Sequence, residues 1–95
     1  MNIEDFEIKI KKYDREKNVV YINLLIYGIA EVRNFVIRYT ETKHSPLHPV
    51  WVVNPPAVKG RGGKYFWIFK INDPALWELV QKKIIDEVKE YTDLL

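Results

Sequence analysis

Cysteine is absent from this 95-residue chain, and methionine occurs only once. The absence of cysteine excludes disulfides, thiolate zinc sites and thiol catalysis. No apolar run approaches the roughly 18 residues that a membrane-spanning helix needs. The first residues are polar and acidic, unlike a secretion signal. We therefore expect a cytoplasmic protein with no membrane partner.

Apolar residues make up 47% of the chain and aromatic residues 14%, which excludes a disordered protein. The length suits one domain spanning residues 1–95. So much large apolar surface in so short a chain has to be buried in a core, in an interface or under a ligand.

Positive charge is concentrated in the middle of the chain, although the net charge is only +2. Residues 41–72 carry five cations against one acid, a net charge of +4, whereas residues 73–95 carry three cations against six acids, a net charge of −3. Such asymmetry shapes the surface field and therefore bears on partners more than on the fold.

Three strands are expected in the first part of the chain. Apolar and charged residues alternate over residues 6–11, which predicts a strand with one solvated face. Residues 19–27 are apolar on both faces and predict an inner strand. Residues 32–39 predict a third strand, with Arg33 and Arg38 on opposite faces. Polar breaks separate the three, so we expect a meander.

The second part of the chain predicts a hairpin. Residues 40–49 contain prolines, histidines and small polar residues and read as a loop. Residues 50–53 predict a short strand that ends at two consecutive prolines, since proline cannot donate to a ladder. A loop then runs to Gly63, and residues 64–71 predict a strongly aromatic strand.

One amphipathic helix is expected at the C-terminal end. Asp73 is a good N-cap, and Pro74 suits the first helical position. Leu79 lies on the otherwise polar side. The apolar stripe at helical spacing consists of Trp77, Val80, Ile84, Val88, Tyr91 and Leu95. The predicted fold is therefore α+β: a five-stranded antiparallel sheet, made of a meander plus a hairpin, followed by one helix.

A single helix covers only one face of a sheet, and two of the predicted strands are apolar on both faces. We expect a second copy of the chain to cover the remaining apolar surface in a homodimer. The alternative is that the sheet curls and buries part of itself.

A glycine-rich basic segment is the main candidate site. Lys59, Arg61 and Lys64 are interleaved with three glycines, a composition that lets backbone amides and cations approach phosphates. Lys43, in the preceding loop, is a further candidate nucleic-acid contact. The segment opens a strand rather than a helix, so it is not a nucleotide-binding P-loop. The alternative is a solvated hairpin loop whose glycines serve only turn geometry.

Aromatic side chains follow this segment directly. Tyr65, Trp67 and Phe69 share one face of the predicted strand, and Phe66 shares the other with Ile68. We expect core or interface packing for both sets, with base stacking on an open sheet face as the alternative.

Two histidines, His44 and His48, lie four residues apart in the proline-containing loop, with Glu41 as the nearest carboxylate. A metal site needs three or four ligands, and a catalytic histidine needs a paired nucleophile or an orienting carboxylate. Neither constellation is recognisable. We expect no enzyme, no metal, no cofactor and no small-molecule substrate.

The layout resembles the stage V sporulation protein G (SpoVG) family. The resemblance is carried by residues 50–56, a strand ending in prolines, by the aromatic residues 65–68 after a polar loop, and by a proline-initiated helix bearing Ile84, Val88 and Tyr91. It implies a small α+β protein that dimerises by exchanging elements and regulates through DNA without a cofactor. Its plausible DNA contacts here are Lys59, Arg61 and Lys64.

Two functional hypotheses follow. The first is a small dimeric nucleic-acid-binding regulatory protein, with DNA favoured over RNA, that uses the basic glycine-rich hairpin loop. The alternative is a non-enzymatic protein-interaction or structural oligomerisation module built on the aromatic strand and the helix.

Overall fold

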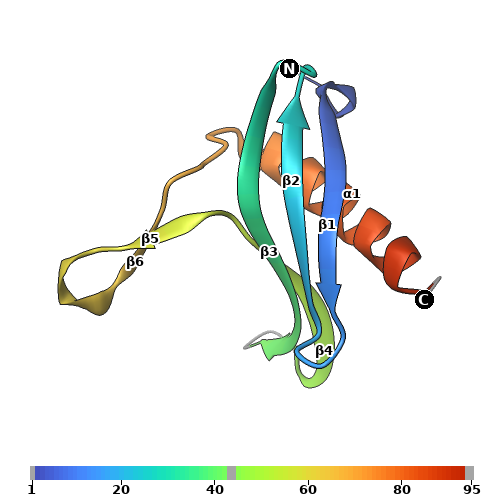
Figure 1. Ribbon diagram of the computed structural model, residues 1–95, viewed down its shortest axis with the longest axis vertical. Helices are drawn as coiled ribbons and strands as arrows, with labels where there is room; N and C mark the ends of the chain where they lie inside the picture. The colour runs from blue at the N-terminus through green and yellow to red at the C-terminus, as the bar shows by residue number, and fades with distance from the viewer. Residues whose placement is uncertain (1, 43–44, 94–95) are drawn as a thin grey trace.

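The computed structural model describes residues 2–42 and 45–93, so Lys43, His44 and Leu95 lie outside the described residues. The elements in chain order are η1 (Ile3–Asp5), β1 (Phe6–Asp14), β2 (Val19–Ile26), β3 (Ala30–Thr42), β4 (Ser45–Asn54), β5 (Ala57–Lys59), η2 (Arg61–Gly63), β6 (Tyr65–Trp67) and α1 (Pro74–Asp93). Strands β1 to β4 form an antiparallel sheet in chain order, and β5 pairs with β6 as a separate hairpin (Figure 1). The α+β class, the meander and the C-terminal helix are confirmed.

The predicted five-stranded sheet is wrong, because the chain leaves the main sheet after Asn54. Pro55 and Pro56 lack the amide hydrogens that would continue the β4 ladder, and both are buried at the point of exit. Beyond them, residues 57–59 pair with residues 65–67 instead of with the main sheet. The molecule therefore has a four-stranded body and a two-stranded hairpin.

The segment 40–49, predicted as a loop, is also mostly strand. β3 continues to Thr42, which pairs with Ser45 of β4, and Thr40 pairs with Val50. Four residues of β4 thus bulge opposite a single residue of β3. Because β4 is an edge strand of the sheet, its prolines remove no hydrogen bond from a second ladder, and the strand tolerates them.

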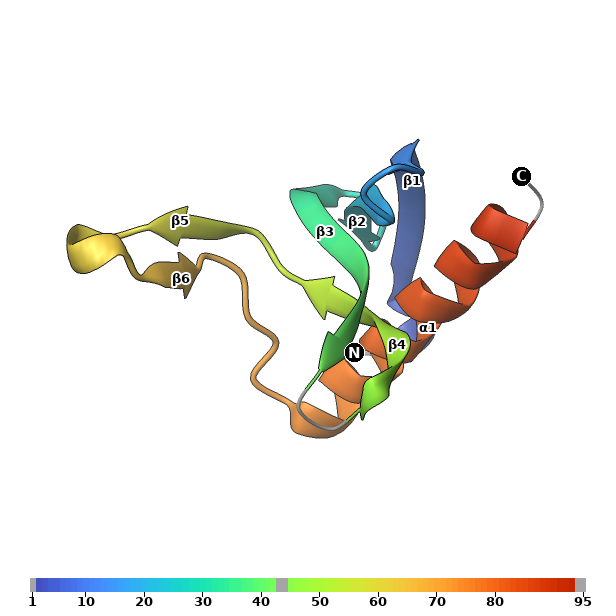
Figure 2. The same cartoon turned by 90° about the horizontal axis from the view of Figure 1, so that it is seen from below.

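Helix α1 covers one face of the four-stranded sheet, and Figure 2 shows it on the side of the body opposite the hairpin. Asp73 caps it as predicted: its Oδ1 accepts hydrogen bonds from the amides of Ala75, at 3.0 Å, and Leu76, at 3.2 Å. The helix contacts both edge strands, β1 and β4. No helix in the described residues is long and apolar enough to cross a membrane.

The core lies between α1 and the sheet. The predicted stripe is confirmed at its centre, while Trp77 is half-buried and Tyr91 and Leu79 are exposed. The fully buried side chains of this core come from three strands and the helix: Phe6, Val20, Ile22, Leu24, Phe35, Ile37, Val80, Ile84 and Val88. The opposite face of the sheet carries no helix in the described part of the chain.

A β-bulge in β3 turns both of its arginines to this uncovered face. Arg33 and Asn34 together oppose one residue of β2, and Asn34 takes a left-handed φ of 70°. The extra residue allows both Val32 and Phe35 to pack toward the core, although they are three positions apart. Arg33 and Arg38 therefore lie on the same face, and the prediction of opposite faces is wrong.

One carboxylate on the sheet-facing side of α1 makes stability depend on pH. Burial raises the pKa of Glu87 above 4.5, and Glu90 and Glu7 raise it further, while Lys83 acts in the opposite direction. Among the described residues, the Oε2 atom of Glu87 is buried without a hydrogen-bond partner. Ionised Glu87 therefore destabilises the folded state.

We expect Glu87→Gln to raise the melting temperature near neutral pH. A group whose pKa is raised by folding stabilises the fold below its unfolded pKa, and this contribution is lost as the pH rises through the folded pKa. The advantage of the variant should therefore disappear on acidification through that range. Circular dichroism melts over an acid-to-neutral pH series measure it, with the exposed Glu78→Gln as control. A lower melting temperature for Glu87→Gln at neutral pH would show that attraction to Lys83 outweighs burial.

Candidate nucleic-acid interface

The hairpin of β5, η2 and β6 forms an arm (residues 55–68) that projects from the body in Figures 1 and 2. Large apolar side chains on both of its faces are at least half exposed; they are Val58, Tyr65, Phe66, Trp67 and Ile68. An isolated two-stranded hairpin is at best marginally stable in water. The apolar surface of the aromatic segment, which the sequence analysis assigned to an uncovered sheet face, thus lies on the arm, while that of β2 remains in the sheet.

Three predicted contacts meet at the end of the arm. Lys59 ends β5, Arg61 begins η2, and Lys64 precedes β6. We call these three residues the basic tip. All three are exposed, and none forms an ion pair with another residue of the described chain. The tip therefore presents three uncompensated positive charges away from the body.

Backbone geometry accounts for the glycines of the tip. Gly62 and Gly63 both have a φ of 80°, in the left-handed region that glycine adopts without strain. At Gly60, whose amide donates to the Lys64 carbonyl at 2.7 Å, a Cβ would lie 2.5 Å from the Phe66 ring. Turn geometry at Gly62 and Gly63 and the close approach of Phe66 at Gly60 account for these glycines, so the cations rather than the glycines carry the case for a phosphate site.

We expect Gly62→Ala to loosen the tip without destabilising the body. A non-glycine residue in the left-handed region costs on the order of 1–2 kcal/mol, here within the arm. Amide hydrogen exchange at Gly60 should accelerate while the melting temperature stays within error. The matched control is Gly28→Ala, in the β2–β3 turn of the body at a φ of 70° with equally open surroundings, which should lower the melting temperature. Unchanged exchange at Gly60 in the first variant would contradict the described turn.

The aromatic residues divide between body and arm. Phe69 packs edge-on against core residue Phe35, with ring centroids 5.6 Å apart, and Trp67 meets Trp77 of α1 at 6.4 Å. The predicted strand 64–71 ends at Trp67, so Phe69 does not continue the arm. Core packing is confirmed for Phe69 but not for the exposed rings on the arm.

Of the other predicted positions, Lys43 and His44 lie outside the described residues. His48 lies in β4 and not in the arm. In the described ranges 2–42 and 45–93, no group of three or more His, Asp or Glu side chains is placed to hold a metal ion.

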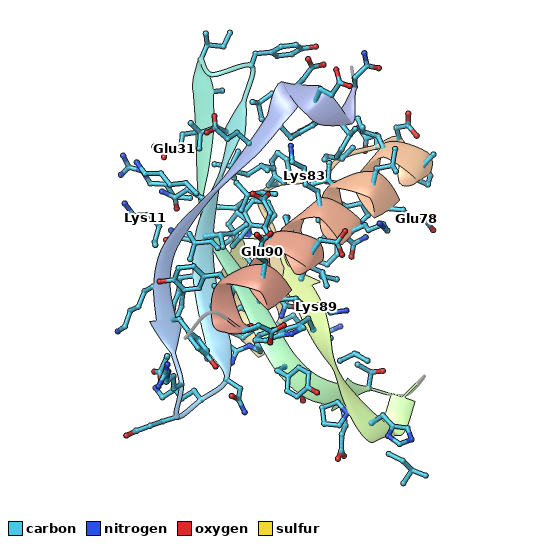
Figure 3. The ribbon with its side chains drawn as sticks, turned by 90° about the vertical axis from the view of Figure 1, so that its right-hand side faces the viewer. Lys11, Glu31, Glu78, Lys83, Lys89 and Glu90 are labelled. Atoms are coloured by element: carbon cyan, nitrogen blue, oxygen red, sulfur yellow. The ribbon has the colours of Figure 1, made fainter. Side chains whose placement is uncertain are left out.

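Sequence reasoning missed a second group of cations on the uncovered sheet face. A groove of about 440 Å³ crosses β1, β2 and β3 there. We call it the sheet groove; its lining side chains include Lys9, Lys11, Tyr21, Asn23, Glu31, Arg33 and Asn34. In Figure 3, Lys11 and Glu31 lie on the side of the sheet away from α1.

A second bulge, in β1, positions part of this groove. Ile10 pairs with Ile22 and Lys12 with Tyr21, so Lys11 is the extra residue. The two bulges lie on either side of β2 at the same level. Each appears in the sequence as two adjacent polar residues interrupting an apolar–polar alternation, which is the signal that could have located them.

Comparisons with protein-family models, with curated proteins and with solved structures give no match. The resemblance to the SpoVG family and the DNA-binding role that it implies therefore stay predictions.

Proposed function

We propose that this protein is a small dimeric nucleic-acid-binding regulatory module, with DNA as the favoured ligand, and that the basic tip contacts the phosphate backbone. The observation that carries the proposal is the position of Lys59, Arg61 and Lys64, exposed and without ion pairs in the described chain, at the end of a projecting arm. Cations so placed neutralise phosphates and release counterions.

The number of cations favours a dimer. A strong binder makes about six to ten phosphate contacts, whereas one tip supplies three cations. A second copy doubles them. The face of the arm that carries Val58 and Phe66, opposite the face of Tyr65 and Trp67, supplies apolar surface that association would bury, and burying it would stabilise a hairpin that is marginal alone.

Fluorescence anisotropy with labelled duplex and single-stranded DNA, each at about 50 mM and 200 mM salt, tests the proposal. Affinity should fall as salt rises, because each phosphate contact releases counterions. Absence of binding at the lower salt concentration, or binding without a salt dependence, would contradict it.

The same apolar surface favours a second candidate, a protein-interaction or oligomerisation module. Both candidates predict self-association, which sedimentation measures, so affinity for DNA distinguishes the two. Phe66→Ser should weaken self-association in both cases, because Phe66 is 55% exposed on the arm. Under the first proposal the wild-type assembly binds DNA through the tip; under the second it forms without any affinity for DNA.

A further inference from the structure

The sheet groove carries a positive charge of its own, separate from the basic tip. Lys9, Lys11 and Arg33 line it together with one carboxylate, Glu31, which leaves two net positive charges. The Glu31 carboxylate lies 3.7 Å from the Arg33 Nε and accepts a hydrogen bond of 3.2 Å from the side-chain Nδ2 of Asn23. Lys9 and Lys11 are exposed and form no ion pair within the described residues.

The groove also contains groups that can recognise a base. Tyr21 lies on β2 between the two bulges, and Asn34 is held in the left-handed region at the edge of the groove. An aromatic face stacks on any base, and an amide side chain can donate to and accept from a base edge.

Asn34 connects this groove to the arm. It also lines a larger groove of about 780 Å³ between β3 and the arm, which includes Arg38, Tyr65 and Trp67. The two grooves thus adjoin at Asn34, and we call the groups from Lys9 and Lys11, past Asn34, to Arg38 and the exposed rings of the arm the path. Beyond those rings, at the far end of the arm, lies the basic tip.

We propose that this path binds a single-stranded nucleic acid, with phosphates on Lys9, Lys11, Arg33 and Arg38 and with bases stacked on Tyr21 and the rings of the arm. The inference rests on the proposed function and names its ligand class. A cationic groove interleaved with accessible aromatic rings is the arrangement used for unpaired strands. A duplex keeps its bases stacked on one another, so it could use the cations but not the rings.

The test compares Lys9→Gln/Lys11→Gln with the control Lys82→Gln/Lys89→Gln, which removes the same charge from exposed positions of α1. The probe is a labelled DNA single strand of about 12 nucleotides, within the range of known single-strand sites, with its duplex in parallel. For single strands, the logarithm of the affinity falls with the logarithm of the salt concentration with a slope of about −0.7 per phosphate contact. Near 0.1 M salt this corresponds to about a fivefold loss of affinity for each cation removed. We expect the groove variant to lose about 25-fold in single-strand affinity and its salt dependence to be shallower by about 1.4 in slope. The affinity of the control should change little.

Trp67→Leu separates stacking from charge. It should weaken single-strand binding at least about fivefold while leaving duplex binding unchanged, because only an unpaired base can stack on the ring. Amide chemical shifts of Lys9, Lys11 and Arg33 in the wild-type protein, titrated with the single strand, report on the groove without any substitution and should move.

The outcomes separate this inference from the proposed function. If single-strand affinity is unchanged in Lys9→Gln/Lys11→Gln and the amide shifts of Lys9, Lys11 and Arg33 do not move, the sheet groove is not a binding site. The proposed role of the basic tip is unaffected by that result. Tighter binding of the duplex than of the single strand, with no effect of Trp67→Leu on either affinity, would overturn the proposal that the ligand is single-stranded. Absence of binding to either probe by the wild-type protein would overturn the proposed function itself.

Discussion

Ile84→Ala is expected to lower the free energy of unfolding by about 2–5 kcal/mol, because a buried isoleucine leaves a cavity when it is truncated. Ile84 is fully buried in the middle of α1 against the sheet. A domain of this size has a total stability on the order of 5–15 kcal/mol, so the variant loses a large part of it. Urea unfolding followed by circular dichroism measures the change.

Leu79→Ala on the same helix is the matched control. Leu79 is 50% exposed, so its truncation removes less buried surface and leaves no enclosed cavity. Its expected cost is below about 1 kcal/mol. Alanine gains more helix propensity over isoleucine than over leucine. This gain reduces the measured cost of Ile84→Ala, so the difference between the two variants is a lower limit. Equal costs for the two variants would show that α1 does not pack on the sheet through Val80, Ile84 and Val88.

Removal of all three charges of the basic tip, Lys59→Gln/Arg61→Gln/Lys64→Gln, is expected to reduce affinity for DNA on the order of 100-fold near 0.1 M salt. Each cation removed by substitution leaves one phosphate without a protein contact, so fewer counterions are released on binding. The fold should persist, because the three residues are exposed and make no ion pair in the described chain. Anisotropy titration measures the affinity, and the far-ultraviolet circular dichroism spectrum checks the fold.

Lys17→Gln/Lys82→Gln/Lys89→Gln provides the charge-matched control. It lowers the net charge by the same three units at exposed positions in the β1–β2 turn and on α1. Its affinity should stay within a few-fold of the wild-type value. An equal loss in both triple variants would mean that net charge, and not the position of the tip, determines binding.

The helix was predictable because its signals are local. Asp73 and Pro74 mark its beginning, and the spacing of Val80, Ile84 and Val88 defines its buried face. A cap and a stripe depend only on residues within a few turns of one another. The structure changed none of these assignments.

The two faces of β3 were not predictable in the same way. Arg33 and Arg38 are five positions apart, which in an uninterrupted strand means opposite faces. The bulge at Asn34 changes that parity. Two adjacent polar residues mark the break in the alternation, but whether the break is a bulge depends on how two strands align across the sheet.

The arm was predictable in composition but not in position. The basic, glycine-rich and aromatic segment is evident in the sequence, and its location outside the main sheet is not. Two buried prolines and the pairing of residues 57–59 with 65–67 decide that location. Both depend on contacts between segments that are distant along the chain.

The sequence by itself determined the α+β class, the meander, the capped helix and the three charges of the basic tip, since each rests on local periodicity, capping or composition. Only the tertiary structure decided that the hairpin leaves the sheet as an arm. It also decided that two bulges bring Lys9, Lys11 and Arg33 together on the uncovered face. The physical reason is that strand register and the choice of pairing partner are settled by packing between segments, which no single stretch of residues encodes.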